Sequence, residues 1–197
     1  NIVLDSHGYA KLCDFGLARF LWPSTGRAYT VCGTPEYKAP EISSGEGYTG
    51  AADWWALGVL VYELMVGETP FYGESAEEVL ERARQGFESI HFLQESHWSS
   101  LVRGLCRLDP SLRLPLLRGG VENVRTHSWF RWPAFDWQQL ICRKMRAPHR
   151  PFLRSPTDLC NFSTKEQQPP KDPIYVESTS DDWDKDFEDP LGPARTE

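Results

Sequence analysis

The stretch that decides the fold runs from Asp14 to Glu41 and reads DFGLARFLWPSTGRAYTVCGTPEYKAPE. It begins with the tripeptide DFG, ends with the tripeptide APE, and contains CGTPEY between them. Two short apolar runs separated by turn residues precede it, so we expect a β-hairpin over residues 2–13, directly before Asp14. Within the stretch, Gly, Thr and Pro interrupt any hydrophobic period, which predicts an ordered loop over residues 15–40.

Helical patterns follow this loop. The apolar run from about Thr49 to Val66 predicts a helix that ends at Gly67 and is buried on all sides. Ser75 and Glu78 have the spacing of a capping box, which indicates the start of the next helix. The later helices are expected at residues 75–86, 99–108 and 121–127. The fold class predicted is mainly α, with a short β-hairpin at the start.

The character of the sequence changes after Trp132, where Pro recurs and the hydrophobic period is lost. We therefore expect a domain over residues 1–130 and an extended tail over residues 131–197, acidic and partly disordered from about residue 165. Residues 172–197 hold nine acidic and two basic residues, which accounts for the whole net charge of -7. A neutral body with an acidic end does not favour nucleic-acid binding, and the acidic end is equally consistent with solvated chain.

The cysteines and the most apolar run bear on the cellular location of the protein and on whether it spans a membrane. The five cysteines are scattered without a C-x-x-C pair, so neither a zinc site nor a disulfide framework is predicted, and we expect a reducing, cytoplasmic location. The most apolar run, Ala51 to Val66, is too short for a membrane span and contains Asp53 and Glu63. No membrane span is therefore expected.

These motifs, in this order and spacing, resemble the AGC group of serine/threonine protein kinases. The resemblance rests on CGTPEYKAPEI, ADWWALGVLVYELMVGETPF, LCRLDPSLRL and THSWF, and it covers residues 1 to about 187. In the tail, SPTDLCNF and DDWDKDF are most similar to the cyclic-GMP-dependent kinases. The resemblance implies the C-terminal lobe of the protein-kinase fold with its C-terminal tail, and ATP-dependent phosphorylation of Ser or Thr on proteins.

A magnesium site and a phosphorylation site are implied by the same motifs. Mg²⁺ prefers oxygen ligands, which the carboxylate of Asp14 and the side-chain amide of Asn1 can supply at the ends of the hairpin. Alternatively, Asn1 is only the first residue of the sequence. Thr30 matches the activation-loop position that an upstream kinase phosphorylates, and Arg19 matches a position that helps to hold the phosphate. The alternative is an unmodified, exposed threonine.

Two glutamates are candidates for substrate recognition. Glu36 and Glu63 match family positions that attract Arg on the amino-terminal side of the target residue, which implies protein substrates with basic residues there. Burying a carboxylate in an apolar helix costs free energy unless the carboxylate is paired. For Glu63, the competing interpretation is therefore a structural partner within the lobe, such as Tyr or Arg.

A pocket for the residue after the phosphorylated Ser or Thr is implied at Val31, Pro35 and Lys38. The family usually has an apolar residue where this chain has Lys38, so we expect a weaker preference for apolar residues, or a preference for acidic or polar ones. The resemblance also gives Thr34 a catalytic part, because the hydroxyl at this position contacts the catalytic Asp of the family.

Other matches are structural or concern the nucleotide. The resemblance implies that Asp53 holds the backbone of the catalytic loop, and that Glu41 and Arg113 form a structural ion pair. Phe162 matches the aromatic residue that reaches the adenine pocket. The aromatic residue expected three positions later is Lys165 in this chain.

Several parts of a complete kinase are missing from these residues. The Gly-rich loop, its Lys, the Glu that positions that Lys, and the catalytic Asp have no match in the sequence. We therefore expect the chain to be the back half of a longer kinase and inactive by itself, since binding of both ATP and Mg²⁺ needs the other lobe. The alternative is a truncated, non-catalytic lobe that binds substrates or regulators. Control by cyclic nucleotides stays open.

Overall fold

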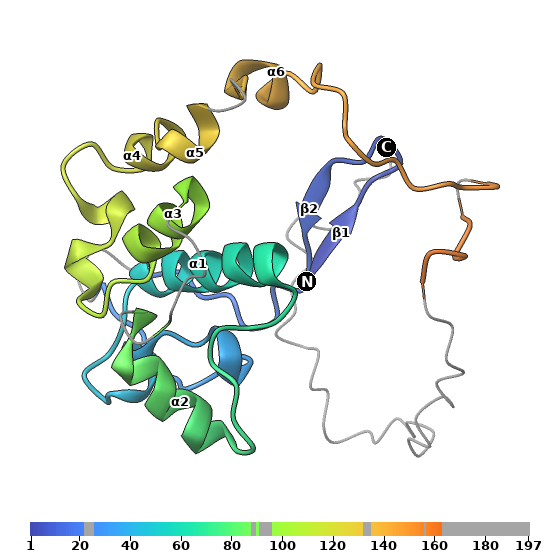
Figure 1. Ribbon diagram of the computed structural model, residues 1–197. Helices are drawn as coiled ribbons and strands as arrows, with labels where there is room; N and C mark the ends of the chain where they lie inside the picture. Colours follow the sequence, from blue (N-terminus) through green and yellow to red (C-terminus); the bar gives the residue numbers. More distant parts are fainter. Residues whose placement is uncertain (22–25, 88–89, 91–95, 132–134, 156, 163–197) are drawn as a thin grey trace, which may run out of the picture. The chain divides into compact units, whose positions relative to one another are not determined.

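A computed structural model of the chain is shown in Figure 1. The chain divides into two compact units, Asn1–Arg150 and a second unit that begins at Pro151. The structure describes residues 1–21, 26–87, 90, 96–131, 135–155 and 157–162.

The first unit opens with the predicted hairpin. Strands β1 (Ile2–Leu4) and β2 (Ala10–Leu12) pair antiparallel, with Val3 opposite Lys11. The backbone N–H of Cys13 donates to the carbonyl oxygen of Asn1 at 3.0 Å and extends the pairing beyond the strands. The hairpin therefore brings its two ends together directly before Asp14.

The turn of the hairpin is built around Asp5. Its Oδ1 accepts hydrogen bonds from the backbone N–H groups of His7 (2.9 Å) and Tyr9 (3.0 Å), and these bonds lower the pKa of the Asp5 carboxyl. Asp5 also forms an ion pair with Arg143, and the hydroxyl of Tyr9 donates to the carbonyl oxygen of Met145 at 2.6 Å. The segment after residue 142 is thus fixed to the hairpin turn.

After the hairpin, the named elements of the first unit among the described residues are all helices, which confirms the predicted mainly α fold class. Figure 1 shows α1 in the middle of this helical part, with α3 beside it. The helices are α1 (Ala51–Val66), α2 (Ala76–Gln85), α3 (His97–Leu105), α4 (Glu122–Arg125), α5 (Ser128–Arg131) and α6 (Trp137–Ile141). Short 3-10 helices span Pro35–Tyr37, Pro40–Ser43, Pro110–Leu112 and Leu114–Leu116.

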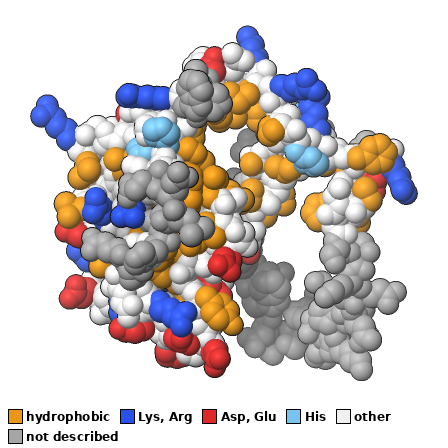
Figure 2. All heavy atoms as spheres, in the orientation of Figure 1, with side chains coloured by type: hydrophobic (Ala, Val, Ile, Leu, Met, Phe, Trp, Pro, Cys, Tyr) orange, Lys and Arg blue, Asp and Glu red, His pale blue; other side chains and the backbone are white. Residues whose placement is uncertain are grey.

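Local signals place two of these helices correctly. Gly67, at a left-handed φ of 93°, ends α1, and its N–H donates to the carbonyl oxygen of Glu63. Ser75 caps the start of α2 because its hydroxyl accepts from the N–H of Glu78 at 3.2 Å. Acidic side chains gather over α2, as Figure 2 shows.

The expected bounds of the third helix are wrong at both ends. It begins earlier than residue 99, because Ser96 and Ser99 form a reciprocal capping box before α3. It ends at Leu105 rather than Leu108. Asp109 does not end this helix but starts the next 3-10 helix, since its Oδ1 accepts from the N–H of Ser111 at 2.9 Å.

Two further expectations are corrected. The last turn of α1 is not buried: Leu64 is 73% and Met65 48% exposed. The elements that cover α1 pack against the face of Trp55 and Tyr62 instead. Regular structure also continues after Trp132 as α6, because the carboxylate of Asp136 accepts from the N–H of Gln139 at 2.9 Å.

The core lies between α1 and its neighbours. The ring of Trp55 is fully buried, stacks on Phe71 at 5.7 Å between ring centres, and meets Phe87 edge-on at 5.9 Å. Gly58 lets α3 approach, because a Cβ there would lie 2.2 Å from the sulfur of Cys106. Among the described residues, none of the helices has both the length and the apolar character needed to cross a bilayer.

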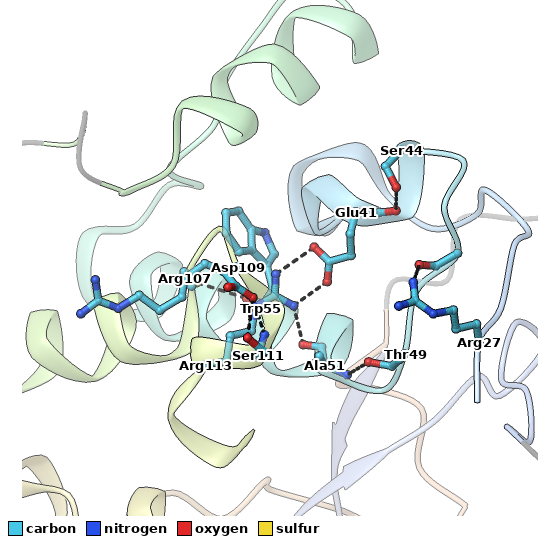
Figure 3. Close-up of polar contacts among 12 residues, drawn as sticks. Arg27, Glu41, Ser44, Thr49, Ala51, Trp55, Arg107, Asp109, Ser111 and Arg113 are labelled. Carbon is cyan, nitrogen blue, oxygen red and sulfur yellow. Dashed lines mark hydrogen bonds and ion pairs between the residues drawn. The ribbon is translucent and has the colours of Figure 1, made fainter. Parts of the chain in front are cut away.

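Among the described residues of the first unit, Arg113 is the one fully buried charged residue (Figure 3). Its two terminal nitrogens donate to Oε1 and Oε2 of Glu41 at 2.6 and 2.8 Å, and one also donates to the carbonyl oxygen of Ala51 at 2.7 Å. Its Nε donates to the carbonyl oxygen of Arg107 at 3.1 Å. The ion pair that the family resemblance implied between Glu41 and Arg113 is therefore present.

Replacing Glu41 with Gln should lower the free energy of unfolding by about 3 kcal/mol or more, because the buried guanidinium loses its counter-charge. Urea denaturation measures this difference. Glu122→Gln is the matched control: Glu122 pairs with Arg125 at 3.5 Å with its side chain 62% exposed, so the loss should stay below about 1 kcal/mol. Equal losses in the two variants would contradict the structural role of Glu41.

Candidate functional site

An open cavity of about 520 Å³ lies where the segment after the hairpin meets the start of α1. Its wall includes apolar side chains such as Leu17 and Ile42. Polar and charged side chains from four segments also face it, namely those of Asn1, Arg19, Thr34, Lys38 and Asp53. Five of the residues predicted to function therefore meet at one cavity.

Asn1 and Asp14 lie at the same end of the hairpin. The hydrogen bond between Asn1 and Cys13 holds this end closed, and Asp14 follows at once. Asp14 has a left-handed φ of 59°, which Asp tolerates better than most residues, and its Oδ1 accepts from the N–H of Gly16 at 3.2 Å. Both side chains are exposed.

Asn1 and Asp14 both offer side-chain oxygen atoms, the kind of ligand that Mg²⁺ prefers. Within the described ranges, no group of three or more His, Cys, Asp and Glu side chains is placed to hold a metal ion. Mg²⁺ in nucleotide enzymes is commonly held by only one or two protein oxygen ligands, with phosphates and water completing its shell. The oxygen atoms of Asn1 and Asp14 match that donor set.

Thr30 and Arg19 approach each other across the loop. Nη1 of Arg19 lies 3.4 Å from Oγ1 of Thr30, and both side chains are exposed. A phosphate on Thr30 would add nearly two negative charges within reach of this guanidinium. The backbone of Thr30 is held separately, since its carbonyl oxygen accepts from the hydroxyl of Tyr48 at 2.7 Å.

The predicted substrate residues lie on and around the 3-10 helix Pro35–Tyr37. Thr34 precedes this helix with its side chain exposed, and Lys38 follows it. Both line the cavity, whereas Val31 and Pro35 are not among its lining residues. Val31 is 58% exposed, and Pro35 and Glu36 are half-buried. The structure thus brings Lys38 to the cavity but does not place the whole predicted pocket there.

Glu63 has a partner within the unit. The hydroxyl of Tyr37 donates to Oε2 of Glu63, which joins the 3-10 helix to α1. Burial raises the pKa of Tyr37 to about 12, with the hydrogen bond to Glu63 and the charges of Glu63 and Glu36 as further causes. The structural interpretation of Glu63, a tyrosine partner, is therefore supported by a contact. Its role in substrate binding stays a prediction.

Two other predicted residues, Asp53 and Phe162, lie in different units. Asp53 is exposed in the first turn of α1 and faces the cavity. Phe162 belongs to the second unit, where it is 59% exposed and its N–H donates to the carbonyl oxygen of Leu159 at 2.8 Å. Lys165 and the acidic end at residues 172–197 lie outside the described residues.

Arg27 and Tyr48 hold the segment that carries Thr30, and neither residue was predicted from the sequence. Nη1 of Arg27 donates to the carbonyl oxygens of Glu46 and Gly47. The turn-forming Gly residues at 45 and 47 mark this loop in the sequence, but they give no sign of its long-range partner.

Comparison with known proteins gives consistent matches. The protein kinase domain family matches residues 1–130. The chain is 36% identical over 189 residues to cGMP-dependent protein kinase 2 from Mus musculus, covering 95% of this chain and 24% of that protein. It is 38% identical over 193 residues to cGMP-dependent protein kinase, isozyme 2 forms cD5/T2, from Drosophila melanogaster, covering 95% and 20%.

A third relative extends these matches to yeast. The chain is 37% identical over 181 residues to serine/threonine-protein kinase gad8 from Schizosaccharomyces pombe, covering 90% of this chain and 31% of that protein. The chain therefore spans about a quarter of the length of the curated relatives it matches. These matches confirm the resemblance that the sequence motifs indicated.

The raised pKa of Tyr37 predicts a loss of stability at alkaline pH. The folded state favours the protonated hydroxyl, so its contribution is fully present below about pH 10 and is lost as the pH rises towards 12. We expect Tyr37→Phe to be less stable than the parent protein at pH 8, with a difference that shrinks between pH 10 and 12. Urea denaturation at several pH values measures this. A pH-independent difference would contradict the Tyr37–Glu63 contact.

Proposed function

The chain belongs to the protein kinase domain family, and we propose that it is the back half of a serine/threonine kinase that phosphorylates proteins with ATP. The observation that carries the proposal is the cavity at the start of α1. Asn1, Arg19 and Thr34 come from separate segments and face this one space. The cavity thus gathers a candidate magnesium ligand, a side chain that would hold the phosphate on Thr30, and a hydroxyl that would contact the catalytic Asp. The phosphate loop and that Asp would come from the rest of a longer kinase.

In this proposal, Asn1 and Asp14 hold magnesium with their side-chain oxygens. Mg²⁺ held by these two residues would supply positive charge to offset the negative charge of the ATP phosphates. The closed end of the hairpin keeps the two ligands together. Thr34 orients the catalytic Asp, which would precede Asn1 in a longer kinase, through its exposed hydroxyl.

Thr30 is proposed as the site that an upstream kinase phosphorylates. Arg19 then pairs with the phosphate, which needs little movement because the two side chains already lie 3.4 Å apart. Pairing between a phosphate and an Arg can order a loop. The phosphate would therefore stabilise the segment that forms one wall of the cavity.

Substrates are proposed to carry basic residues before the target Ser or Thr. Glu36 and Glu63 supply the negative charge. The hydrogen bond from the hydroxyl of Tyr37 orients the carboxylate of Glu63. Lys38, together with Val31 and Pro35, is proposed to meet the residue after the target. The positive charge of Lys38 favours an acidic or polar residue there.

The remaining assignments follow the same proposal. Residues 1–130 would form part of the catalytic domain, and residues 131–197 would form a tail whose Phe162 reaches the adenine of ATP. Asp53 would hold the catalytic loop, and the protein would act in the cytoplasm. The chain by itself would be inactive, because the phosphate loop and the catalytic Asp have no match among its residues.

Asp14→Asn in the full-length protein tests this function. Loss of the carboxylate should lower the rate of phosphate transfer from ATP to a serine peptide by a factor on the order of 10²–10³. Asp136→Asn is the matched control, since Asn caps a helix about as well as Asp and this residue lies at α6. If the full-length parent protein binds the peptide but transfers no phosphate, the non-catalytic binding alternative replaces the proposal.

Glu36→Gln should reduce the preference for Arg before the target residue. The loss of one charged hydrogen-bond partner should lower kcat/KM for a peptide with Arg before the target residue by about 10-fold or more. For the same peptide with this Arg replaced by Ala, kcat/KM should change little. Glu46→Gln, at an exposed position, is the control. Equal effects of Glu36→Gln on the two peptides would contradict the assignment.

A further inference from the structure

Two segments far apart in the sequence lie side by side around Thr30. The N–H of Ala28 donates to the carbonyl oxygen of Tyr48, and the N–H of Tyr48 donates to the carbonyl oxygen of Ala28, both at 2.8 Å. Ala28 is only 3% exposed, so this pairing is shielded from water. The chain two residues before Thr30 is therefore fixed to the loop that precedes α1.

A side chain of the same loop holds Thr30 itself. The hydroxyl of Tyr48 donates to the carbonyl oxygen of Thr30 at 2.7 Å. Burial, and then the thiol of Cys32, raise the pKa of Tyr48, so the hydroxyl keeps its proton and remains a donor. The backbone of Thr30 is thus bound, while its hydroxyl stays exposed beside Arg19.

Arg27 and Gly47 add two more contacts between the segment before Thr30 and the loop that precedes α1. Nη1 of Arg27 donates to the carbonyl oxygens of Glu46 at 3.1 Å and Gly47 at 2.9 Å, and Figure 3 shows Arg27 reaching towards this loop. Gly47 has a φ of 78°, and a Cβ there would lie 2.7 Å from Cε1 of Tyr29. A side chain at position 47 would strain this left-handed backbone and would require the exposed ring of Tyr29 to move.

We propose that residues 46–48 form a latch over the backbone of residues 27–30, and that this latch limits the access of modifying enzymes to Thr30. An enzyme that binds this segment as an extended strand needs the backbone groups that the latch already occupies. The rate of modification then follows the population in which the latch is open. The part about Thr30 rests on the proposed function, in which Thr30 is phosphorylated.

The latch predicts faster cleavage of the segment when Tyr48 loses its hydroxyl. In the full-length protein under native conditions, Tyr48→Phe should speed trypsin cleavage after Arg27 about 2- to 10-fold, the factor that corresponds to one hydrogen bond. Tyr72→Phe is the matched control, because Tyr72 is 71% exposed and lies outside the latch. Cleavage after Arg103, inside α3, reports global unfolding and should not change.

A second variant tests the latch more strongly. Gly47→Ala combines a strained backbone with a collision at Tyr29, and should raise the rate of cleavage after Arg27 by about 10-fold or more. Unchanged cleavage after Arg27 in both variants would overturn the latch. An equal rise after Arg27 and Arg103 would overturn it as well, since the effect would then be global.

The role of Thr30 is measured separately, by the phosphate it carries in the full-length protein purified from cells. A broad-specificity protein phosphatase should remove this phosphate about 2- to 10-fold faster from Tyr48→Phe than from the Tyr72→Phe control. Equal rates would overturn the limit on access to Thr30. If Thr30 carries no phosphate while cleavage after Arg27 still rises, the latch stands and the proposed phosphorylation of Thr30 fails.

Discussion

The guanidinium of Arg113 is the constraint on which the other contacts of the first unit depend. It is fully buried, lies 5.3 Å from the ring centre of Trp55, and donates to Glu41, Ala51 and Arg107. These partners come from three separate parts of the chain. Because a buried charge without partners costs several kcal/mol, the three parts cannot separate independently. The end of the loop and the start of α1 are therefore fixed together.

Two more contacts hold the same loop at other points. Tyr48 binds it near Thr30, and Glu63 binds it through Tyr37. The loop is therefore held at three points: Tyr48 contacts it at Thr30, Glu63 contacts it at Tyr37, and Arg113 contacts its end at Glu41. The contacts use backbone groups, two phenols, two carboxylates and the guanidinium of Arg113, whereas the side chains of Thr30 and Thr34 remain exposed. The segment is ordered without covering the groups to which we assign chemistry.

Elements set by neighbouring residues were predicted well. The hairpin and the ends of α1 and α2 follow from turn and capping residues, whose hydrogen bonds span only a few positions. The errors arose where local signals competed. The capping box of Ser96 and Ser99 starts α3 earlier than expected. Asp109, which was predicted to end α3, instead caps the next 3-10 helix. The apolar sequence of α1 also hid the exposure of Leu64, because composition does not say which face is covered.

The sequence by itself determined the chemical groups and their order: the DFG and APE tripeptides, Thr30, and the Glu41–Arg113 pair that the family resemblance implied. The tertiary structure brought Arg19 next to Thr30, as the resemblance implied, and identified Tyr37 as the partner of Glu63. Only the tertiary structure revealed that residues 46–48 hold the segment before Thr30. The physical reason is that motifs and capping signals act over a few neighbouring residues. Hydrogen bonds between distant segments depend instead on how the helices pack, and no local period records that packing.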